Sequence, residues 1–86
     1  MKHLTATEAM FYDYLLTRGY RRSTAKDYAH RIRKIGSIDA LLHQDITPYI
    51  EEYTIGAHQE DNKRVHNAYS GALKRLQEMQ RDKGIL

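Results

Sequence analysis

Apolar side chains recur along this chain at every third or fourth position, which is the spacing of one helix face. A sustained alternation of apolar and polar residues, typical of a strand, is absent, and no Asn-Gly or Asp-Gly pair marks a hairpin turn. The pattern therefore predicts an all-α fold, a compact bundle of four to five helices with short connections.

The first helix is predicted to start at Thr5 and to stop at Gly19. Thr5 and Glu8 have the spacing of a capping box, in which each side chain accepts from the other residue's free backbone amide. Gly19 is placed to end the helix. The residues expected to share one face of this helix are Met10, Phe11, Tyr14, Leu15 and Arg18.

The second helix is predicted to be capped by the hydroxyl of Ser23 or Thr24 and closed by Gly36. Its apolar stripe is expected to consist of Ala25, Tyr28, Ala29, Ile32 and Ile35. At about 100° per residue the opposite face should present Ser23, Asp27, His30 and Lys34, with Lys26, Arg31 and Arg33 on the flanks.

A short turn at residues 38–42 should precede a third helix, for which Thr47 is the expected cap and Pro48 the first residue. This helix should end at Gly56, and residues 56–61 are expected to form a linker. The last helix is predicted from a cap at Asp61 or Asn62 to Lys83. Its expected buried residues are Val65, Ala68, Tyr69, Ala72, Leu76 and Met79, and those pointing away are Lys63, Asn67, Ser70 and Lys74.

Length and composition favour one globular domain, residues 1–86. A content of 41% hydrophobic and 29% charged residues argues against disorder. No apolar run is long enough to span a membrane, and the N-terminus lacks the apolar segment of a signal peptide. A cytoplasmic location is expected, with no membrane partner.

Positive and negative charges are separated along the chain, although the net charge is only +3. Residues 18–34 hold seven Lys or Arg against Asp27 alone. Residues 37–62 hold six acids and no Lys or Arg, and residues 63–86 hold six Lys or Arg against two acids. Two basic segments thus flank an acidic one, which fits either solvated helix faces or a surface that binds a polyanion.

The chain carries no recognisable catalytic or metal-binding motif. Cysteine is absent, none of the five histidines are paired at a spacing of four, and no nucleophile–base pair or Gly-rich phosphate loop occurs. We therefore expect a non-catalytic domain with no metal and no cofactor. The two basic helices could instead offer their outer faces to one DNA duplex, because a helix fits the major groove.

The chain resembles the N-terminal core-binding (SAM-like) domain of tyrosine recombinases and phage integrases, and the matching residues follow one another in the order of that family. The resemblance is carried by Phe11-x-x-Tyr14-Leu15 with Gly19, Ser23-Thr24-x-x-x-Tyr28, Leu42-x-x-Asp45-Ile46-Thr47, Asn67-x-Tyr69-Ser70-x-Ala72-Leu73-Lys74 and the tail Gly84-Ile85-Leu86. It covers nearly the whole chain. It implies a helical bundle that clamps recombination-site DNA, with the catalytic residues in a separate domain and other recombinase protomers as partners.

The resemblance also implies which residues contact DNA. The second-helix contacts fall on Ser23, Lys26 and Asp27, with Thr24 near the phosphates. The fourth-helix contacts fall near Lys63, Arg64 and Asn67, with Lys74 further along. The charge pattern adds Arg21 and Arg22 as phosphate-facing residues. The expected DNA-binding set is Arg21, Arg22, Ser23, Thr24, Lys26, Asp27, His30, Lys34, Lys63, Arg64, Asn67 and Lys74.

Two positions depart from the family pattern. Asp27 stands where related proteins often carry a neutral or basic residue, so it is expected either to accept from a cytosine amino group or to pair with Arg31. Arg64 stands where the family usually carries a small hydroxyl residue that caps the fourth helix, so the cap is expected at Asp61 or Asn62 instead.

Three classes of function remain open. In the first, the chain is a fragment of a longer integrase, missing its catalytic domain, and is a monomer when isolated. In the second, it is a helical protein-interaction module without DNA binding, whose acidic segment meets a basic face of another copy or domain. The third class, an enzyme, has no catalytic constellation to support it.

Overall fold

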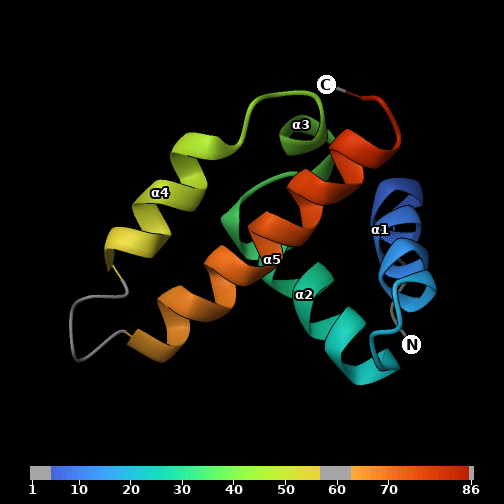
Figure 1. The fold of residues 1–86 in the computed structure, drawn as a ribbon, viewed down its shortest axis with the longest axis horizontal. Helices are drawn as coiled ribbons and strands as arrows, with labels where there is room; N and C mark the ends of the chain where they lie inside the picture. Colours follow the sequence, from blue (N-terminus) through green and yellow to red (C-terminus); the bar gives the residue numbers. More distant parts are fainter. Residues whose placement is uncertain (1–4, 57–62, 86) are drawn as a thin grey trace.

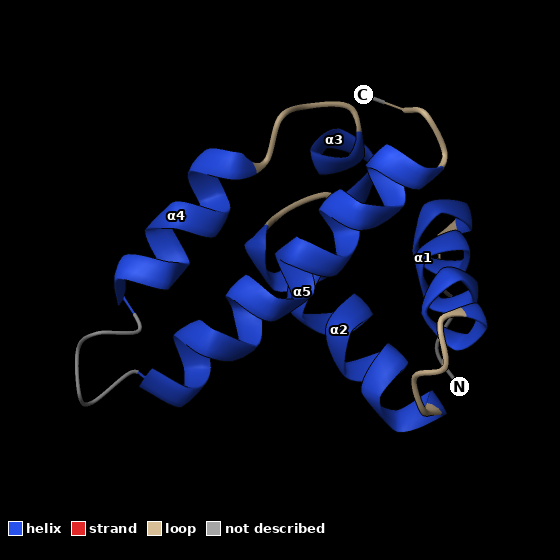
Figure 2. Cartoon of the chain, in the orientation of Figure 1, coloured by secondary structure: helices blue, strands red, loops and turns tan. Residues whose placement is uncertain are grey.

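Five α-helices account for most of residues 5–56 and 63–85, the residues that this computed structural model describes; side chains are described for residues 5–55 and 66–85. They are α1 (Ala6–Thr17), α2 (Arg22–Ile35), α3 (Ile38–Leu42), α4 (Thr47–Gly56) and α5 (Lys63–Asp82). Figure 2 shows helices and loops alone in these ranges, without a strand. The predicted all-α class with four to five helices is confirmed.

The longest helix, α5, crosses the molecule, and each of the other four helices packs against it (Figure 1). Its side chains Ala72, Leu73, Leu76 and Met79 are fully buried. The α1 and α2 helices also pack against each other. The radius of gyration is 12.5 Å, near the roughly 12 Å expected of a compact chain of this length. One core therefore holds all five helices.

Both ends of α1 form as predicted. The Thr5 hydroxyl accepts from the Glu8 amide at 3.1 Å, and the Glu8 carboxylate accepts from the Thr5 amide at 3.3 Å. At the other end Gly19 adopts a φ of 94°, and the Tyr20 amide donates to the Leu15 carbonyl at 3.0 Å. This left-handed glycine turn directs the chain immediately into α2.

The predicted cap of α2 is wrong. The helix begins at Arg22, and the extended residue that precedes it is Arg21, whose side chain makes no capping bond. Ser23 and Thr24 therefore lie inside the first turn. The tight turn at Gly19 brings the chain back within two residues, so the Arg21 carbonyl already accepts from the Ala25 amide at 2.9 Å. The predicted end at Gly36 is confirmed.

The short element at residues 38–42 is the helix α3, and α4 begins at Thr47, one residue earlier than predicted. Thr47 is not the cap. The Asp45 carboxylate accepts instead from the Thr47 hydroxyl at 2.7 Å and from the Thr47 amide at 3.0 Å. Both hydrogen bonds lower the pKa of the Asp45 carboxyl, and the bond from the hydroxyl has the larger effect. The predicted end at Gly56 is confirmed.

The last helix differs from its prediction in the width of its buried face. Ser70, expected to point away from the core, is buried, as is Leu73, which was not assigned to the stripe, whereas Ala68 and Tyr69 of the predicted stripe are only half-buried. Because α4 and α2 cover opposite flanks of α5, more of its circumference is enclosed than one stripe. The helix ends at Asp82, with Gly84 at a φ of 68°. Three predictions lie outside the described part of the chain. They concern the linker from residue 57 onward, the caps at residues 61 and 62, and the side chain of residue 65.

A buried polar side chain ties α5 to α3. Gln80 is 2% exposed, and its amide nitrogen lies 3.1, 2.9 and 2.9 Å from the carbonyl oxygens of Leu41, Leu42 and Gln44. These carbonyls lie at the C-terminal end of α3, where helical partners run out. Gln80 therefore supplies from another helix the donors that the short helix lacks.

Replacing Gln80 with methionine keeps the side-chain volume but removes this buried donor from the Leu42 and Gln44 carbonyls, whereas the Leu41 carbonyl still accepts from the Gln44 backbone amide at 3.3 Å. We expect Gln80→Met to lower the free energy of unfolding by about 2–3 kcal/mol. Gln44→Met is the matched control, because Gln44 is exposed and its loss should cost less than about 0.5 kcal/mol. Urea denaturation followed by circular dichroism measures both, and equal effects would contradict the role given to Gln80.

Candidate nucleic-acid interface

The outer side of α2 exposes most of the predicted site residues of this segment. Ala25, Ala29 and Ile32 are buried and define the inner side of the helix. The exposed residues on and next to the other side, called here the α2 face, are Arg21, Arg22, Ser23, Lys26, Asp27, His30 and Lys34. Thr24 is half-buried, at the edge nearer α5. The helix therefore presents its basic residues together to one side of the molecule.

Among its described side chains, α5 exposes a narrow strip in addition to Asp82 at its end. Asn67 and Lys74 are exposed, as predicted, and Arg81 continues the same line. These three residues, the α5 strip, are spaced by seven, or about two helical turns. Arg81 was not among the predicted site residues, although this spacing could have identified it. Lys63 and Arg64 lie in the first turn of α5, and their side chains lie outside the described part.

The α2 face and the α5 strip are held side by side by aromatic and small residues. The α2 and α5 helices pack against each other, and the Tyr28 hydroxyl reaches the surface of α5 at Gly71, where an added Cβ atom would lie 3.9 Å from it. The rings of Tyr20 and Tyr28 meet edge to face at 5.8 Å, and Arg75 donates to the Tyr20 hydroxyl at 2.8 Å. Tyr20 is half-buried in this joint.

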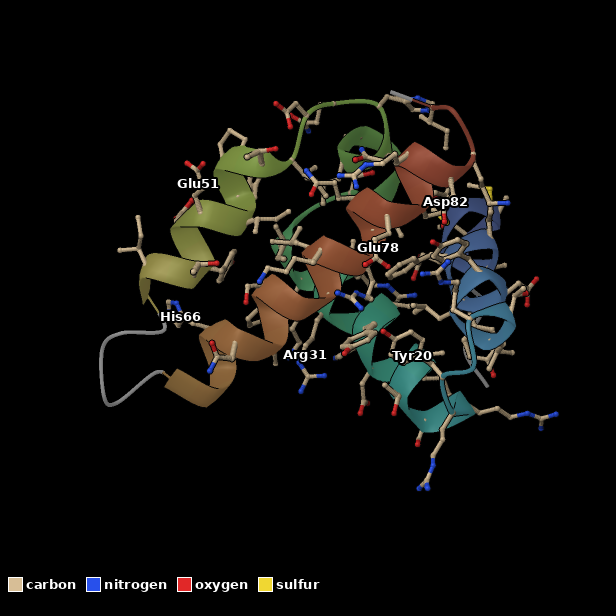
Figure 3. All side chains as sticks on the ribbon, viewed as in Figure 1. Tyr20, Arg31, Glu51, His66, Glu78 and Asp82 are labelled. Atoms are coloured by element: carbon tan, nitrogen blue, oxygen red, sulfur yellow. The ribbon has the colours of Figure 1, made fainter. Side chains whose placement is uncertain are left out.

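Ion pairs neutralise some of the arginines and leave others free. Arg33 donates to the buried carboxylate of Glu8 from two nitrogens, at 2.5 and 3.0 Å. Arg18 lies 3.7 Å from Asp82 and 4.0 Å from Glu78, and Glu78 also pairs with Arg75 at 3.3 Å. These acids lie on α1 and on the end of α5 nearest to it (Figure 3). They therefore consume positive charge away from the α2 face.

The cations of the α2 face keep their charge available. Among the described side chains, none within 4 Å forms an ion pair with Arg21, Arg22, Lys26 or Lys34. Exposed ammonium and guanidinium groups of this kind attract phosphates at long range. The arrangement suits a polyanion that covers α2 and extends toward the α5 strip.

Asp27 does not form the ion pair with Arg31 that the sequence offered as one possibility. No contact within 4 Å joins their charged groups in the described part of the chain. Arg31 is half-buried and emerges where α2 passes α5, with its guanidinium directed outward (Figure 3). It therefore adds positive charge at the junction of the two surfaces.

Two further properties bear on the chemistry of the molecule. Residues 5–56 and 63–85 contain no cluster of three or more His, Cys, Asp or Glu side chains that could hold a metal ion. Over the same ranges, no helix combines the length and the apolar character needed to cross a bilayer.

Comparison with known proteins found no matching family model, no matching curated protein and no matching solved structure.

The ion-pair network beside α1 predicts a pH dependence. The Tyr14 hydroxyl donates to Asp82 at 2.5 Å, and partial burial together with this bond raises the pKa of Tyr14 to about 12. A raised pKa means that the protonated hydroxyl stabilises the fold fully below pH 10, the ordinary value, and that this contribution is lost as the pH rises through about 12.

We expect Tyr14→Phe to lower stability at neutral pH and to lose less stability than the wild type between about pH 10 and 12. Thermal unfolding across this range measures the effect, and ultraviolet absorbance follows tyrosine ionisation. Tyr12→Phe is the control, since the Tyr12 hydroxyl makes no hydrogen bond with a described residue. A parallel pH profile for Tyr14→Phe and the wild type would refute the proposed bond.

Proposed function

We propose that this domain binds double-stranded DNA through the α2 face and the α5 strip, as the non-catalytic core-binding domain of a tyrosine recombinase. The observation that carries the proposal is the set of cations on the α2 face that form no ion pair with a described residue, whereas Arg18, Arg33 and Arg75 are held by acids. A helix face that only meets solvent does not require that its cations stay unpaired. A DNA-binding face requires unpaired cations, since a cation that is paired with an acid of the protein is no longer available to bind phosphate.

The dimensions and chemistry of the two surfaces support this proposal. An α-helix fits the DNA major groove, and Lys, Arg, Ser and Asn side chains supply donors for phosphates and base edges. The resemblance to recombinase core-binding domains assigns DNA contacts to the second and the long fourth helix. Counted without the five-residue α3, these are α2 and α5. An all-helical bundle is also the architecture that this resemblance implies.

The strength and salt dependence of binding follow from the charges. An isolated domain that mainly contacts phosphates should bind DNA with a dissociation constant on the order of 10⁻⁴–10⁻⁶ M. Each phosphate contact contributes about −0.9 to the slope of log affinity against log salt. Binding should therefore be detectable at low salt and fall steeply as salt is added.

Removing one cation from each surface tests the proposal. Lys26→Ala and Lys74→Ala should each weaken binding to duplex DNA and make the salt slope shallower by about 0.9. Lys83→Ala is the matched control, because Lys83 is also exposed but lines a hollow against α1, with Ala6 and Met10. Fluorescence anisotropy at several salt concentrations measures both quantities. No binding by the wild type at low salt, or equal losses in all three variants, would contradict the proposal.

A second candidate function, a protein-interaction module, is favoured by one observation on α4. Ile55 is 67% exposed, and Pro48, Glu51 and Glu52 are exposed on the same side. Figure 3 shows Glu51 directed away from α5. This α4 face, Pro48, Glu51, Glu52 and Ile55, combines an apolar side chain with two negative charges. Its partner would be a basic surface, such as the α2 face of another copy.

This candidate predicts salt-sensitive self-association. Sedimentation at low salt should then show dimers or larger species that dissociate as salt is added, since the contact is electrostatic. Ile55→Asp should abolish this association without lowering the melting temperature, because Ile55 is outside the core. A wild type that is monomeric at low salt and high concentration would exclude the candidate.

A further inference from the structure

Asp27 lies on the part of the α2 face that is farthest from the core. It lies almost opposite the buried residues Ala25 and Ala29, at about 100° per residue, and it is exposed. The exposed residues that share this side of the helix with it, within two turns, are Ser23, His30 and Lys34. A helix that enters a groove with this side foremost therefore brings Asp27 to its deepest point.

The carboxylate of Asp27 has no ion-pair or hydrogen-bond partner among the described residues. The cation best placed to neutralise it, Arg31 at four residues' distance, forms no ion pair with it. No hydrogen bond joins the Asp27 side chain to another described residue. The group is therefore an uncommitted acceptor within a surface of donors.

A free carboxylate in this position disfavours phosphate but suits one kind of base edge. A carboxylate only accepts hydrogen bonds. In the major groove cytosine presents the N4 amino donor, guanine presents two acceptors, thymine presents one acceptor and a methyl group, and adenine places its N7 acceptor beside its amino group. Cytosine is thus the base whose edge offers a donor to Asp27 without an adjacent acceptor that repels it.

We infer that Asp27 is a specificity-determining residue, which accepts a hydrogen bond from the N4 amino group of a cytosine in the major groove. This inference rests on the proposed function, that the α2 face binds DNA. The cations around Asp27 hold the helix to the phosphates and supply affinity for any sequence. Asp27 restricts which sequences are bound well, because a wrong base leaves the carboxylate desolvated and without a donor.

The test compares the base preference of the full chain with that of Asp27→Asn. Duplexes are selected from a randomised library at low salt, and the selected duplex is then titrated beside versions with each other base at the preferred position. The wild type should prefer cytosine by on the order of tenfold. Asp27→Asn should lose this preference and favour adenine, because an amide pairs with adenine through both N6 and N7.

Asp13→Asn is the matched control. Asp13 is an exposed aspartate on α1, so its replacement makes the same change in net charge away from the α2 face. It should leave the cytosine preference intact. Circular dichroism of Asp27→Asn should match the wild type, since the side chain is exposed and makes no internal contact that the fold needs.

The two ways of failing are distinguishable. If Asp27→Asn binds all duplexes more tightly by the same factor, with an unchanged order of preference, Asp27 only lowers the surface charge and the inference is overturned. If the wild type selects no cytosine, it is overturned as well. If the wild type binds no duplex at low salt, the proposed function itself fails, and the role of Asp27 fails with it.

Discussion

The enclosure of α5 by the other four helices is the constraint on which the remaining structure depends. A helix covered on several sides must be apolar or small over most of its circumference, and Ala72, Leu73, Leu76 and Met79 meet this requirement. Along the described side chains of α5 before Asp82, the exposed residues form a strip one residue wide, Asn67, Lys74 and Arg81. The same packing places α2 beside α5, with the Tyr28 hydroxyl next to Gly71. The core thus decides which polar residues of two distant segments face solvent together.

Acidic residues divide the arginines into two groups. Glu8 illustrates how, because one carboxylate both closes the capping box of α1 and accepts two bonds from Arg33. Glu78 and Asp82 hold Arg18 beside the end of α5. Such partly exposed pairs contribute little stability individually. Their larger effect is spatial, because they neutralise cations beside α1 and leave Arg21, Arg22, Lys26 and Lys34 on α2 without an ion pair among the described residues.

Local signals predicted the elements of this fold well. The capping box at Thr5 and Glu8 and the glycine stops at Gly19 and Gly36 depend on residues close in sequence, and the structure confirms each of them. The start of α2 was misplaced because the turn at Gly19, and not a hydroxyl, decides where that helix begins.

Contacts between distant segments were beyond the reach of periodicity. Gln80 was not assigned a role because its three acceptors lie some 40 positions earlier in the chain, at residues 41, 42 and 44. Ser70 was placed outside the core because one helix face was assumed to be buried, whereas two neighbours cover α5. At the candidate interface, the exposure of Lys26, Asp27 and Lys74 followed from the helix pattern. The pairing of Arg33 with Glu8 did not, since it joins two helices.

The placement of the acidic α4 face adds an orienting effect to the proposed DNA binding. With a net charge of only +3, the whole molecule is a weak attractant for a polyanion, so its affinity depends on where the charges lie. The α4 and α2 helices pack on different sides of α5 (Figure 1). A duplex that approaches α4 meets Glu51 and Glu52, and one that approaches α2 meets unpaired cations. Repulsion on one side and attraction on the other turn the domain toward DNA before contact, which favours a single binding orientation at low ionic strength.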